Sequence, residues 1–178
     1  MDLALLRAAN GLLAGPTRPL WEWLGSDAAA VVLAIAIVGY ALWKRRWAWI
    51  VAGGLAVALT DPLCARVLKP AIARDRPCRT IPDLPTLRDC GAGLAMPSVH
   101  AANAAALAAA TGSPVLFAVA LLAGASRVVQ GQHWPSDVVV GWIVGGAIGA
   151  GVGIGTRTAM RRLCQRRGRE GPLEGPWT

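Results

Sequence analysis

Uncharged, strongly apolar runs alternate with short polar segments along the chain. Five runs follow one another, at 28–43, 47–60 with an extension at 63–68, 99–111, 114–125 and 138–155. A helix that crosses a membrane needs about 20 apolar residues, with a tolerance of a few. The first, second and fifth runs meet this length, whereas the third and fourth are short. Because three neighbouring runs fit, we interpret the short ones as spans too, rather than as buried helices of a soluble protein. The pattern predicts an all-α, polytopic transmembrane helix bundle with five spans.

The segment before the first run, residues 1–25, has its own apolar pattern. Five leucines precede a break at Gly15-Pro16: Leu3, Leu5, Leu6, Leu12 and Leu13. This spacing is typical of an amphipathic helix that lies in the membrane interface. A sixth span is the alternative. The segment has neither the basic start nor the clear cleavage site of a signal peptide.

Composition strengthens the membrane assignment. Hydrophobic residues make up 54% of the chain and charged residues 16%, against about 25% charged residues in an average soluble domain. Such a composition excludes intrinsic disorder. The eight tryptophans, beside one phenylalanine and one tyrosine, suit a protein whose tryptophans lie at membrane interfaces. We therefore expect membrane lipids to surround the chain.

Basic clusters set the predicted orientation. Lys44, Arg45 and Arg46 follow the first run, and the C-terminal tail holds six further arginines: Arg157, Arg161, Arg162, Arg166, Arg167 and Arg169. Positively charged loops stay in the cytoplasm, and the four crossings between the two clusters place both on that side. Contact with anionic lipid accounts for the net charge of +8, so no nucleic-acid partner is expected. The chain divides into a membrane domain at 1–156 and a basic cytoplasmic tail at 157–178.

The fifth run carries a glycine every four residues, at Gly141, Gly145, Gly149 and Gly153. On a helix these positions form one smooth stripe, which lets another helix approach closely. The partner could belong to the same chain or to a second copy. A homo-oligomer formed through this face is therefore one expectation.

Three polar clusters lie at the ends of the runs, and the predicted topology places all of them on the extracytoplasmic side. The first contains Lys69, Arg74 and Arg76, which suits either a phosphate site or a patch that binds lipid headgroups. The second contains Ser98 and His100 at the start of the third run. Ser98 can cap this helix, whose first N–H groups attract an anion. A plain capped helix beside an interfacial histidine gives the same pattern.

The third cluster contains Ser126, Arg127, His133 and Asp137. If the segment is helical, Asp137 can reach one imidazole nitrogen of His133, four residues earlier. This contact fixes the tautomer and leaves the other nitrogen as a nucleophile or base. The alternative is that Asp137 only caps the fifth run.

Taken together, the clusters favour one chemical site over three separate structural features. The chain has two histidines, and both fall at these span ends, with Lys69, Arg76 and Arg127 on the same face. Two histidines and three cations suit phosphoryl transfer without a metal. One histidine attacks phosphorus, the other protonates the leaving oxygen, and the cations bind the equatorial oxygens. No cluster of carboxylates offers a two-metal site, so neither a metal nor a cofactor is expected.

The spacing of these residues resembles the signature of the type 2 phosphatidic acid phosphatase (PAP2) superfamily, which is K-x6-RP, PSGH and SR-x5-H-x3-D. The matching positions are Lys69 with Arg76-Pro77, then Pro97, Ser98 and His100, then Ser126-Arg127, His133 and Asp137. One position departs from the signature, because Val99 stands where the family has glycine. We expect Val99 to lie in a first helical turn, where it still supplies its N–H, since an alanine-rich helix follows at once.

The resemblance implies a role for each matched residue. His133 would attack phosphorus and form a phosphohistidine, oriented by Asp137. His100 would protonate the leaving group and then activate water. The phosphate would be bound by Lys69, Arg76, Ser98 and Arg127. The implied activity is metal-independent hydrolysis of a lipid phosphate or diphosphate on the extracytoplasmic side of a bacterial inner membrane.

The short third and fourth runs imply a sunken site. About twelve residues per crossing give ~18 Å of helix, less than the ~30 Å hydrocarbon core. His100 and Ser126 should then lie below the outer membrane boundary, where a lipid headgroup reaches them from the side. This geometry favours a lipid-borne phosphate over a soluble one.

Some finer points stay open in the sequence. Cys78 and Cys90 in the outer loop could form a disulfide or remain free thiols. Asp61 is expected to pair with a cation such as Arg66. Small bacterial members of the superfamily suggest several substrates: undecaprenyl diphosphate, phosphatidylglycerophosphate, phosphatidate and lipid A phosphate. Arg74 and Arg79 add cations beside the matched residues, and these extra charges slightly favour a diphosphate as the substrate.

Two rival functions remain. The superfamily also includes vanadate-dependent haloperoxidases, which have a similar anion site, although membrane spans argue against that reading. A protein that binds or transports a lipid phosphate without catalysis is the second rival. The presence of both histidines and Asp137 argues against it.

Overall fold

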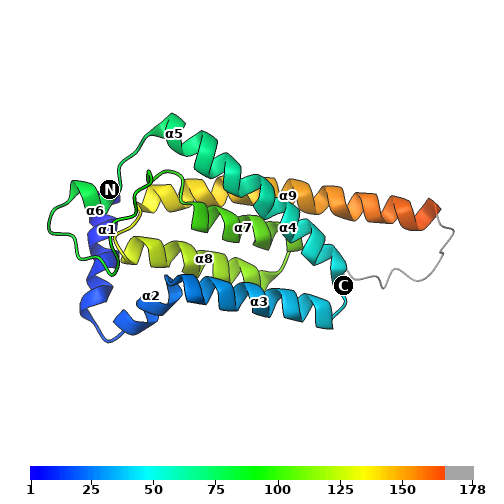
Figure 1. The fold of residues 1–178 in the computed structure, drawn as a ribbon, viewed down its shortest axis with the longest axis horizontal. Coiled ribbons are helices and arrows are strands. Elements are labelled where there is room, and N and C mark those ends of the chain that lie inside the picture. Colours follow the sequence, from blue (N-terminus) through cyan, green and yellow to red (C-terminus); the bar gives the residue numbers. More distant parts are fainter. Residues whose placement is uncertain (167–178) are drawn as a thin grey trace.

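The computed structural model of the chain describes residues 1–166, and the regular elements in that range are all helices. They are α1 (Asp2–Asn10), the 3₁₀-helix η1 (Gly11–Ala14), α2 (Arg18–Leu24), α3 (Asp27–Trp43), α4 (Trp47–Pro62), the π-helix η2 (Leu63–Leu68), α5 (Lys69–Ile72), α6 (Pro77–Thr80), α7 (Val99–Thr111), α8 (Pro114–Val129) and α9 (Pro135–Arg166). The long helices run roughly along one direction, while α1, α6 and the loop after α6 cover one end (Figure 1). The all-α expectation is confirmed.

Helix α7 forms the centre of the bundle and packs against α4, α8 and α9. Alanine fills most of it, so its surface is smooth and its neighbours come close. The helix ends at Gly112, whose φ of 70° places it in the left-handed region that favours glycine. Pro114 then starts α8 two residues later. The buried alanines are Ala101, Ala102, Ala105, Ala106, Ala108 and Ala110.

The glycine stripe of α9 lies directly against α7. A Cβ atom at any of the four glycines would lie within 3.0 Å of a backbone carbonyl oxygen of Ser98, Ala102, Ala106 or Ala110. The stripe is therefore occupied inside the chain. This corrects the expectation that a second copy could pack on this face, because no space is left there for another helix.

Helix α4 continues through a π-helical stretch towards the end covered by α1 and α6. Pro62 lies inside α4, and a proline removes one backbone N–H from the helical ladder. The next six residues form η2 and lead into α5. This continuation places α5, which begins at Lys69, at the same end of the bundle as the starts of α7 and α9 (Figure 1).

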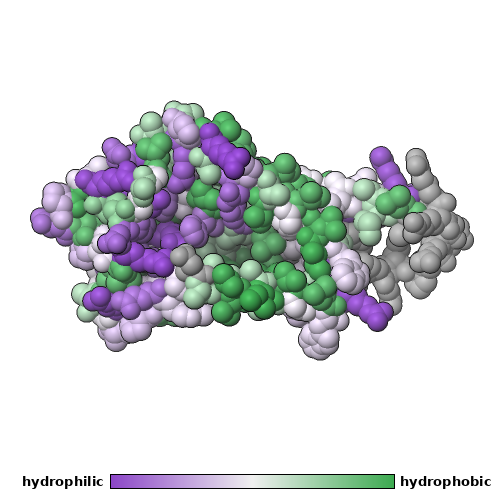
Figure 2. Space-filling model, in the orientation of Figure 1, coloured by the Kyte–Doolittle hydropathy of each residue, from purple (hydrophilic) through white to green (hydrophobic). Residues whose placement is uncertain are grey.

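Large apolar side chains are exposed on the outer faces of the bundle. Examples from α3, α8 and α9 are Ile35, Phe117, Leu121, Ile143 and Ile154, each exposed by 47% or more. Figure 2 shows hydrophobic surface over the middle of the visible face, while hydrophilic residues gather at the end that carries α1 and α6. Such a surface suits a hydrocarbon environment.

Within residues 1–166, length and apolar composition identify two helical segments that can cross a membrane, Trp47–Thr80 and Pro135–Leu163. A third is added if Arg18–Leu24 and Ala28–Trp43, bent by 63°, count as one span. Helix α7 has 13 residues and α8 has 16, so both are shorter than a standard span of about 20. The membrane character is thus supported, but the count of five spans with an interfacial helix is not established by helix length.

The N-terminal segment packs one of its faces against the bundle. Leu6 is fully buried in a core cluster with Ala101, Val128 and Val138. Leu3, Leu5 and Leu12 are exposed. The leucines therefore divide between two faces of the α1–η1 segment, one of which packs on the bundle.

The two ends of the bundle differ in chemistry. The turn between α3 and α4, with Lys44 and Arg46, lies at the opposite end from α1, and α9 also extends beyond its neighbours in that direction (Figure 1). Helix α9 runs on to Arg166, so the first residues of the predicted tail at 157–178 continue the helix. The rest of that tail lies outside the described residues.

Candidate active site

All three polar clusters meet at one end of the bundle. Lys69 is the first residue of α5, and Arg76 immediately precedes α6. Ser98 and His100 lie at the start of α7, and Arg127 lies in the last turn of α8. His133 belongs to the connection between α8 and α9, and Asp137 lies in the first turn of α9. Segments far apart in sequence thus converge where these helices start or end (Figure 1).

His133 and Asp137 form a buried pair. The imidazole Nδ1 of His133 lies 3.4 Å from the carboxylate Oδ2 of Asp137. The same Oδ2 accepts a hydrogen bond from the backbone N–H of Trp134 at 2.8 Å. His133 lies in a turn rather than in a helix, because α9 begins only at Pro135. Both interpretations of Asp137 therefore hold, since it caps the start of α9 and also lies beside the imidazole.

The second oxygen of Asp137 belongs to a network that the motif pattern does not include. Arg74 donates to Asp137 Oδ1 at 2.8 Å and to Asp2 Oδ2 at 2.7 Å. Ser136 donates its backbone N–H to Asp2 Oδ1 and its hydroxyl to Asp2 Oδ2. Although burial opposes it, the hydrogen bonds from Ser136 and Arg74 hold the pKa of Asp2 below its ordinary value. Helix α1 therefore supports the residue that contacts His133.

Lys69 and Arg76 lie close to His133 and hold the loop that follows α6. Lys69 donates to the carbonyl oxygen of Leu94. Arg76 donates from Nε to Gly93 O at 2.8 Å, and from Nη1 to the backbone and side-chain oxygens of Gln132 at 3.3 and 3.2 Å. Because Gln132 immediately precedes His133, these bonds tie the first cluster to the third.

Burial lowers the pKa of His133 below its ordinary value of 6.5. Asp137 opposes this effect, because its negatively charged carboxylate, 3.4 Å from Nδ1, favours the imidazolium. Arg76 and Lys69 lower the pKa further. The imidazole is consequently neutral at physiological pH, which is the form that a nucleophile requires.

Ser98 and Val99 open α7 beside this pair. The backbone N–H of Ser98 donates to the carbonyl oxygen of Asp137 at 3.0 Å. The Ser98 hydroxyl is buried and has no hydrogen-bond partner among the described residues. Val99 is the first residue of α7 and is not among the residues with positive φ. The expectation of a first helical turn at Val99 is confirmed.

His100 and Arg127 border a cavity of about 600 Å³ between α2, α3, α4, α7 and α8. His100 is exposed and Arg127 is buried. Most of the cavity wall is apolar, for example at Leu33, Ile37 and Leu116. His133 is not part of this wall. The two histidines are therefore placed differently, one in the buried cluster and one at an apolar cavity.

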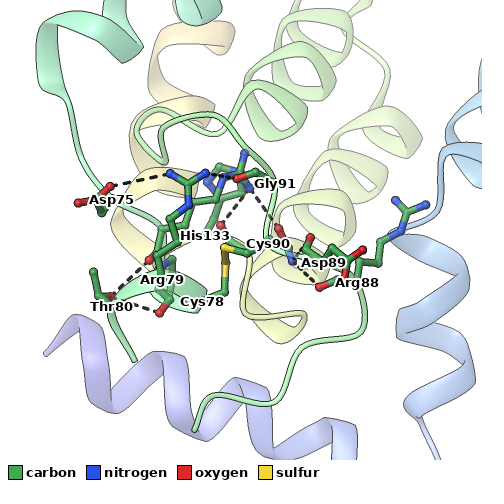
Figure 3. Close-up of a disulfide and its surroundings, with 12 residues drawn as sticks. Asp75, Cys78, Arg79, Thr80, Arg88, Asp89, Cys90, Gly91 and His133 are labelled. Atoms are coloured by element: carbon green, nitrogen blue, oxygen red, sulfur yellow. Dashed lines mark hydrogen bonds and ion pairs between the residues drawn. A yellow bond between two sulfur atoms is a disulfide. The ribbon is translucent and has the colours of Figure 1, made fainter. Parts of the chain in front are cut away.

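A disulfide between Cys78 and Cys90 closes the loop after α6, with a Cα–Cα distance of 5.9 Å. The sequence left open whether these cysteines pair or remain free thiols, and in the structure they are paired. Figure 3 shows His133 among the residues around the disulfide, and Arg79 donating to Gly91 next to Cys90. The bond thereby joins α6 to the loop whose carbonyl groups accept from Lys69 and Arg76.

Two further expectations need correction. Asp61 accepts a hydrogen bond from Asn103 Nδ2 at 2.8 Å, rather than pairing with Arg66. Arg74 is engaged with Asp2 and Asp137, so it no longer supports a lean towards a diphosphate. Within residues 1–166, no group of three or more His, Cys, Asp or Glu residues is placed to hold a metal ion.

The sequence is related to known phosphatases. It is 36% identical over 114 residues to the decaprenylphosphoryl-5-phosphoribose phosphatase of Mycobacterium tuberculosis, which covers 61% of this chain and 62% of the relative. The chain therefore matches less than two thirds of that relative's length. The protein of the same name from Mycolicibacterium smegmatis is 33% identical over 142 residues, covering 78% of this chain and 76% of the relative.

The fold also occurs in a solved structure. A transmembrane PAP2-type phosphatidylglycerolphosphate phosphatase from Bacillus subtilis matches with a TM-score of 0.58 and 22% identity. The match covers 91% of this chain and 85% of that one. At this identity the likeness shows a shared fold.

Residues 47–161 match the PAP2 superfamily. This stretch contains the three polar clusters, the long helices α4, α7 and α8 and most of α9, and it makes up more than half of the chain. The chain belongs to the PAP2 superfamily.

Proposed function

We propose that the protein is a membrane lipid phosphatase that hydrolyses a phosphomonoester through a phosphohistidine at His133. The observation that carries the proposal is the buried His133–Asp137 contact of 3.4 Å, flanked by Lys69 and Arg76. A neutral imidazole held by a carboxylate and facing cations suits nucleophilic attack on phosphorus. The phosphatase names of the relatives support the same activity.

The charged residues around the site have separate roles. Arg74 neutralises Asp137 on the side away from the imidazole, so the carboxylate orients His133 without adding net negative charge opposite the phosphate. Lys69, Arg76 and Arg127 then bind the phosphate oxygens. The Ser98 hydroxyl, buried without a partner, donates to another of them. The negative charge that spreads over these oxygens in the transition state is thereby stabilised.

The reaction proceeds in two steps. His133 Nε2 attacks phosphorus, the bond to the lipid oxygen breaks, and His100 donates a proton to that oxygen. His100, now neutral, accepts a proton from water, whose oxygen attacks the phosphohistidine and releases inorganic phosphate. Asp137 stabilises His133 in the tautomer that presents Nε2. His100 gives up one proton in the first step and recovers one from water in the second, so this scheme needs no metal ion.

The substrate enters from the membrane. The cavity beside His100 and Arg127 is lined mainly by apolar residues of α3, α7 and α8, which suits a lipid chain rather than water. Helix α7, at 13 residues, extends about 20 Å, less than the ~30 Å hydrocarbon core. The site therefore lies below the outer membrane boundary, and helices α3, α4, α7, α8 and α9 form the five spans.

The site faces the extracytoplasmic side. At the opposite end of the bundle, Lys44 lies over the Trp43 ring at 4.2 Å and Arg46 over the Trp49 ring at 4.5 Å. Basic and aromatic residues together are typical of a cytoplasmic interface. The Cys78–Cys90 disulfide at the site end suits an oxidising compartment.

The test measures phosphate release by the purified protein in detergent with EDTA. The panel contains polyprenylphosphoryl phosphoribose, phosphatidylglycerophosphate, phosphatidate, lipid A phosphate and undecaprenyl diphosphate. We expect release that survives EDTA, disappears in His133→Ala and drops by about 10²–10³-fold in Lys69→Gln, as for loss of one group that stabilises transition-state charge. Lys44→Gln is the matched control, because the chain's other lysine lies at the far end.

Each contrary result has a defined meaning. Activity that needs a metal ion, or that persists in His133→Ala, contradicts the histidine mechanism. A folded protein that releases no phosphate from any lipid contradicts catalysis and supports the binding or transport rival. Bromide oxidation with added vanadate would instead support the haloperoxidase rival.

A further inference from the structure

A second polar pair lies outside the three motifs, in the wall of the apolar cavity. Asp61 comes from α4 and Asn103 from α7, and Asn103 Nδ2 donates to Asp61 Oδ1 at 2.8 Å. Both residues line the same cavity as His100 and Arg127. An ionisable side chain on a helix inside a membrane protein marks a functional site by default. The mechanism above uses neither residue.

Both side chains carry hydrogen-bond acceptors in the wall of the cavity. Asn103 Oδ1 is buried and accepts no hydrogen bond among the described residues. The opposite amide orientation would turn this oxygen towards the Asp61 carboxylate, so the contact with Asp61 fixes the orientation. A carboxylate and an orphaned amide oxygen both require O–H or N–H donors. A ligand in the cavity would supply them.

The position of the pair defines which part of a substrate it meets. Asn103 lies three residues after His100 on α7, which is ~4.5 Å farther along the helix axis. If the two histidines hold the scissile phosphate and the lipid chain runs along the cavity, the substrate group attached to that phosphate lies beside Asp61 and Asn103. A sugar ring or a glycerol unit has about that length.

Charge distinguishes the candidates for this unit. Hydroxyl groups donate to the two acceptors, whereas a second phosphate would place negative charge beside the Asp61 carboxylate in an apolar environment. Two cations near the site that could compensate it are engaged elsewhere. Arg74 pairs with Asp2 and Asp137, and Arg79 bonds to Gly91 and approaches Asp75.

We infer that Asp61 and Asn103 form a headgroup subsite that binds the hydroxyls of a neutral glycosyl or glycerol unit between the scissile phosphate and the lipid, and that Asp61 disfavours lipid diphosphates. The inference rests on the proposed phosphatase function and adds its substrate class. Asp61 and Asn103 are specificity-determining residues, and the two histidines carry out the chemistry.

The test compares three substrates with the same lipid chain: a lipid-linked pentose phosphate, its analogue lacking the ring hydroxyls, and the lipid diphosphate. With the unmodified protein, kcat/KM should fall about 10–100-fold when the hydroxyls are absent, because the acceptors lose their donors. The diphosphate should also be a poor substrate. This comparison needs no variant and is independent of folding.

Variants then assign the effect to the pair. Asp61→Asn and Asn103→Ala should each lower kcat/KM on the pentose phosphate by about 10-fold or more, as for removal of a binding hydrogen bond to a charged or buried group. They should leave the analogue unchanged, and Asp61→Asn should raise activity on the diphosphate. Asp83→Asn, in the loop after α6, is the matched control and should change none of the three.

The outcomes separate the inference from the proposed function. Equal rates on the pentose phosphate and its analogue, or equal losses on all three substrates in both variants, would overturn the inference and make the pair a clamp between α4 and α7. In that case His133-dependent phosphate release would still stand. Absence of His133-dependent release from every substrate would instead remove the proposed function.

Discussion

At the scale of single residues, His133 depends on two opposing influences. Burial and the neighbouring cations lower its pKa, while Asp137 raises it. The neutral imidazole is therefore available at a pH below the ordinary value of 6.5, and its availability is lost as the pH falls through the lowered pKa. The acidic limb of kcat/KM should accordingly lie below pH 6.5 if His133 is the nucleophile.

Asp137→Asn tests this balance. Removing the negative charge takes away the influence that raises the pKa of His133, so the acidic limb should move to still lower pH. The rate should fall by about 10²–10⁴-fold, because the tautomer is no longer held. A profile of kcat/KM against pH measures both effects. An acidic limb that moves to higher pH, or does not move while the rate falls, would contradict the assigned contact.

The sequence predicted which residues come together at the candidate site but not the residues that support them. The predicted topology, the positions at span ends and the PAP2 signature brought His100, His133 and Asp137 into one hypothesis, and the structure places them at one end of the bundle. Asp2 could not have been found this way, because its contacts with Arg74 and Ser136 span separations of 72 and 134 residues. No local pattern encodes such a contact. The sequence identified Arg74 as a cation near the site, but it did not show that Asp2 and Asp137 are its partners.

At the scale of elements, the contact between α7 and α9 positions the site. Ser98 at the start of α7 donates to the backbone of Asp137 in α9, so the spacing of these helices sets the geometry around His133. The four-residue glycine period predicted a close helix contact. It could not show that the partner was α7, because alanine-rich helices carry no comparable signal of pairing.

Gly145→Ala should separate the two helices. The added Cβ would meet the backbone of Ala102, which cannot move aside as a flexible side chain can. We expect a loss of about 1–3 kcal/mol in the free energy of unfolding, as for overpacking elsewhere, and a lower melting temperature in detergent. Gly146→Ala is the control, since a Cβ atom added there would meet no atom of a neighbouring helix within 4 Å. Equal effects of the two substitutions would contradict the packing described here.

At the scale of the whole molecule, the helices form a framework whose two ends have different chemistry. The site, the disulfide and α1 share one end, and the basic turn after α3 lies at the other. Runs of apolar residues predicted this arrangement, because helix length and charge follow directly from sequence. The number of spans did not follow, since α7 and α8 are too short for length to decide.

The disulfide is expected to support phosphate binding. A Cys78→Ser, Cys90→Ser double variant frees the loop whose carbonyl oxygens accept from Lys69, Arg76 and Arg79. We expect KM to rise more than kcat falls, and the protein to lose about 2–3 kcal/mol of stability. Steady-state kinetics with thermal unfolding of both proteins measures this. An unchanged KM in a less stable protein would limit the bond to a structural role.

The central claim is that phosphate is transferred to His133. The most direct measurement is to mix the protein with a lipid carrying a ³²P-labelled phosphomonoester, quench rapidly, and locate the label by peptide mapping. The account predicts label on the peptide containing His133, stable in alkali, lost in acid, and absent from His133→Ala. Label on another residue, or phosphate release by His133→Ala at the normal rate, would contradict it.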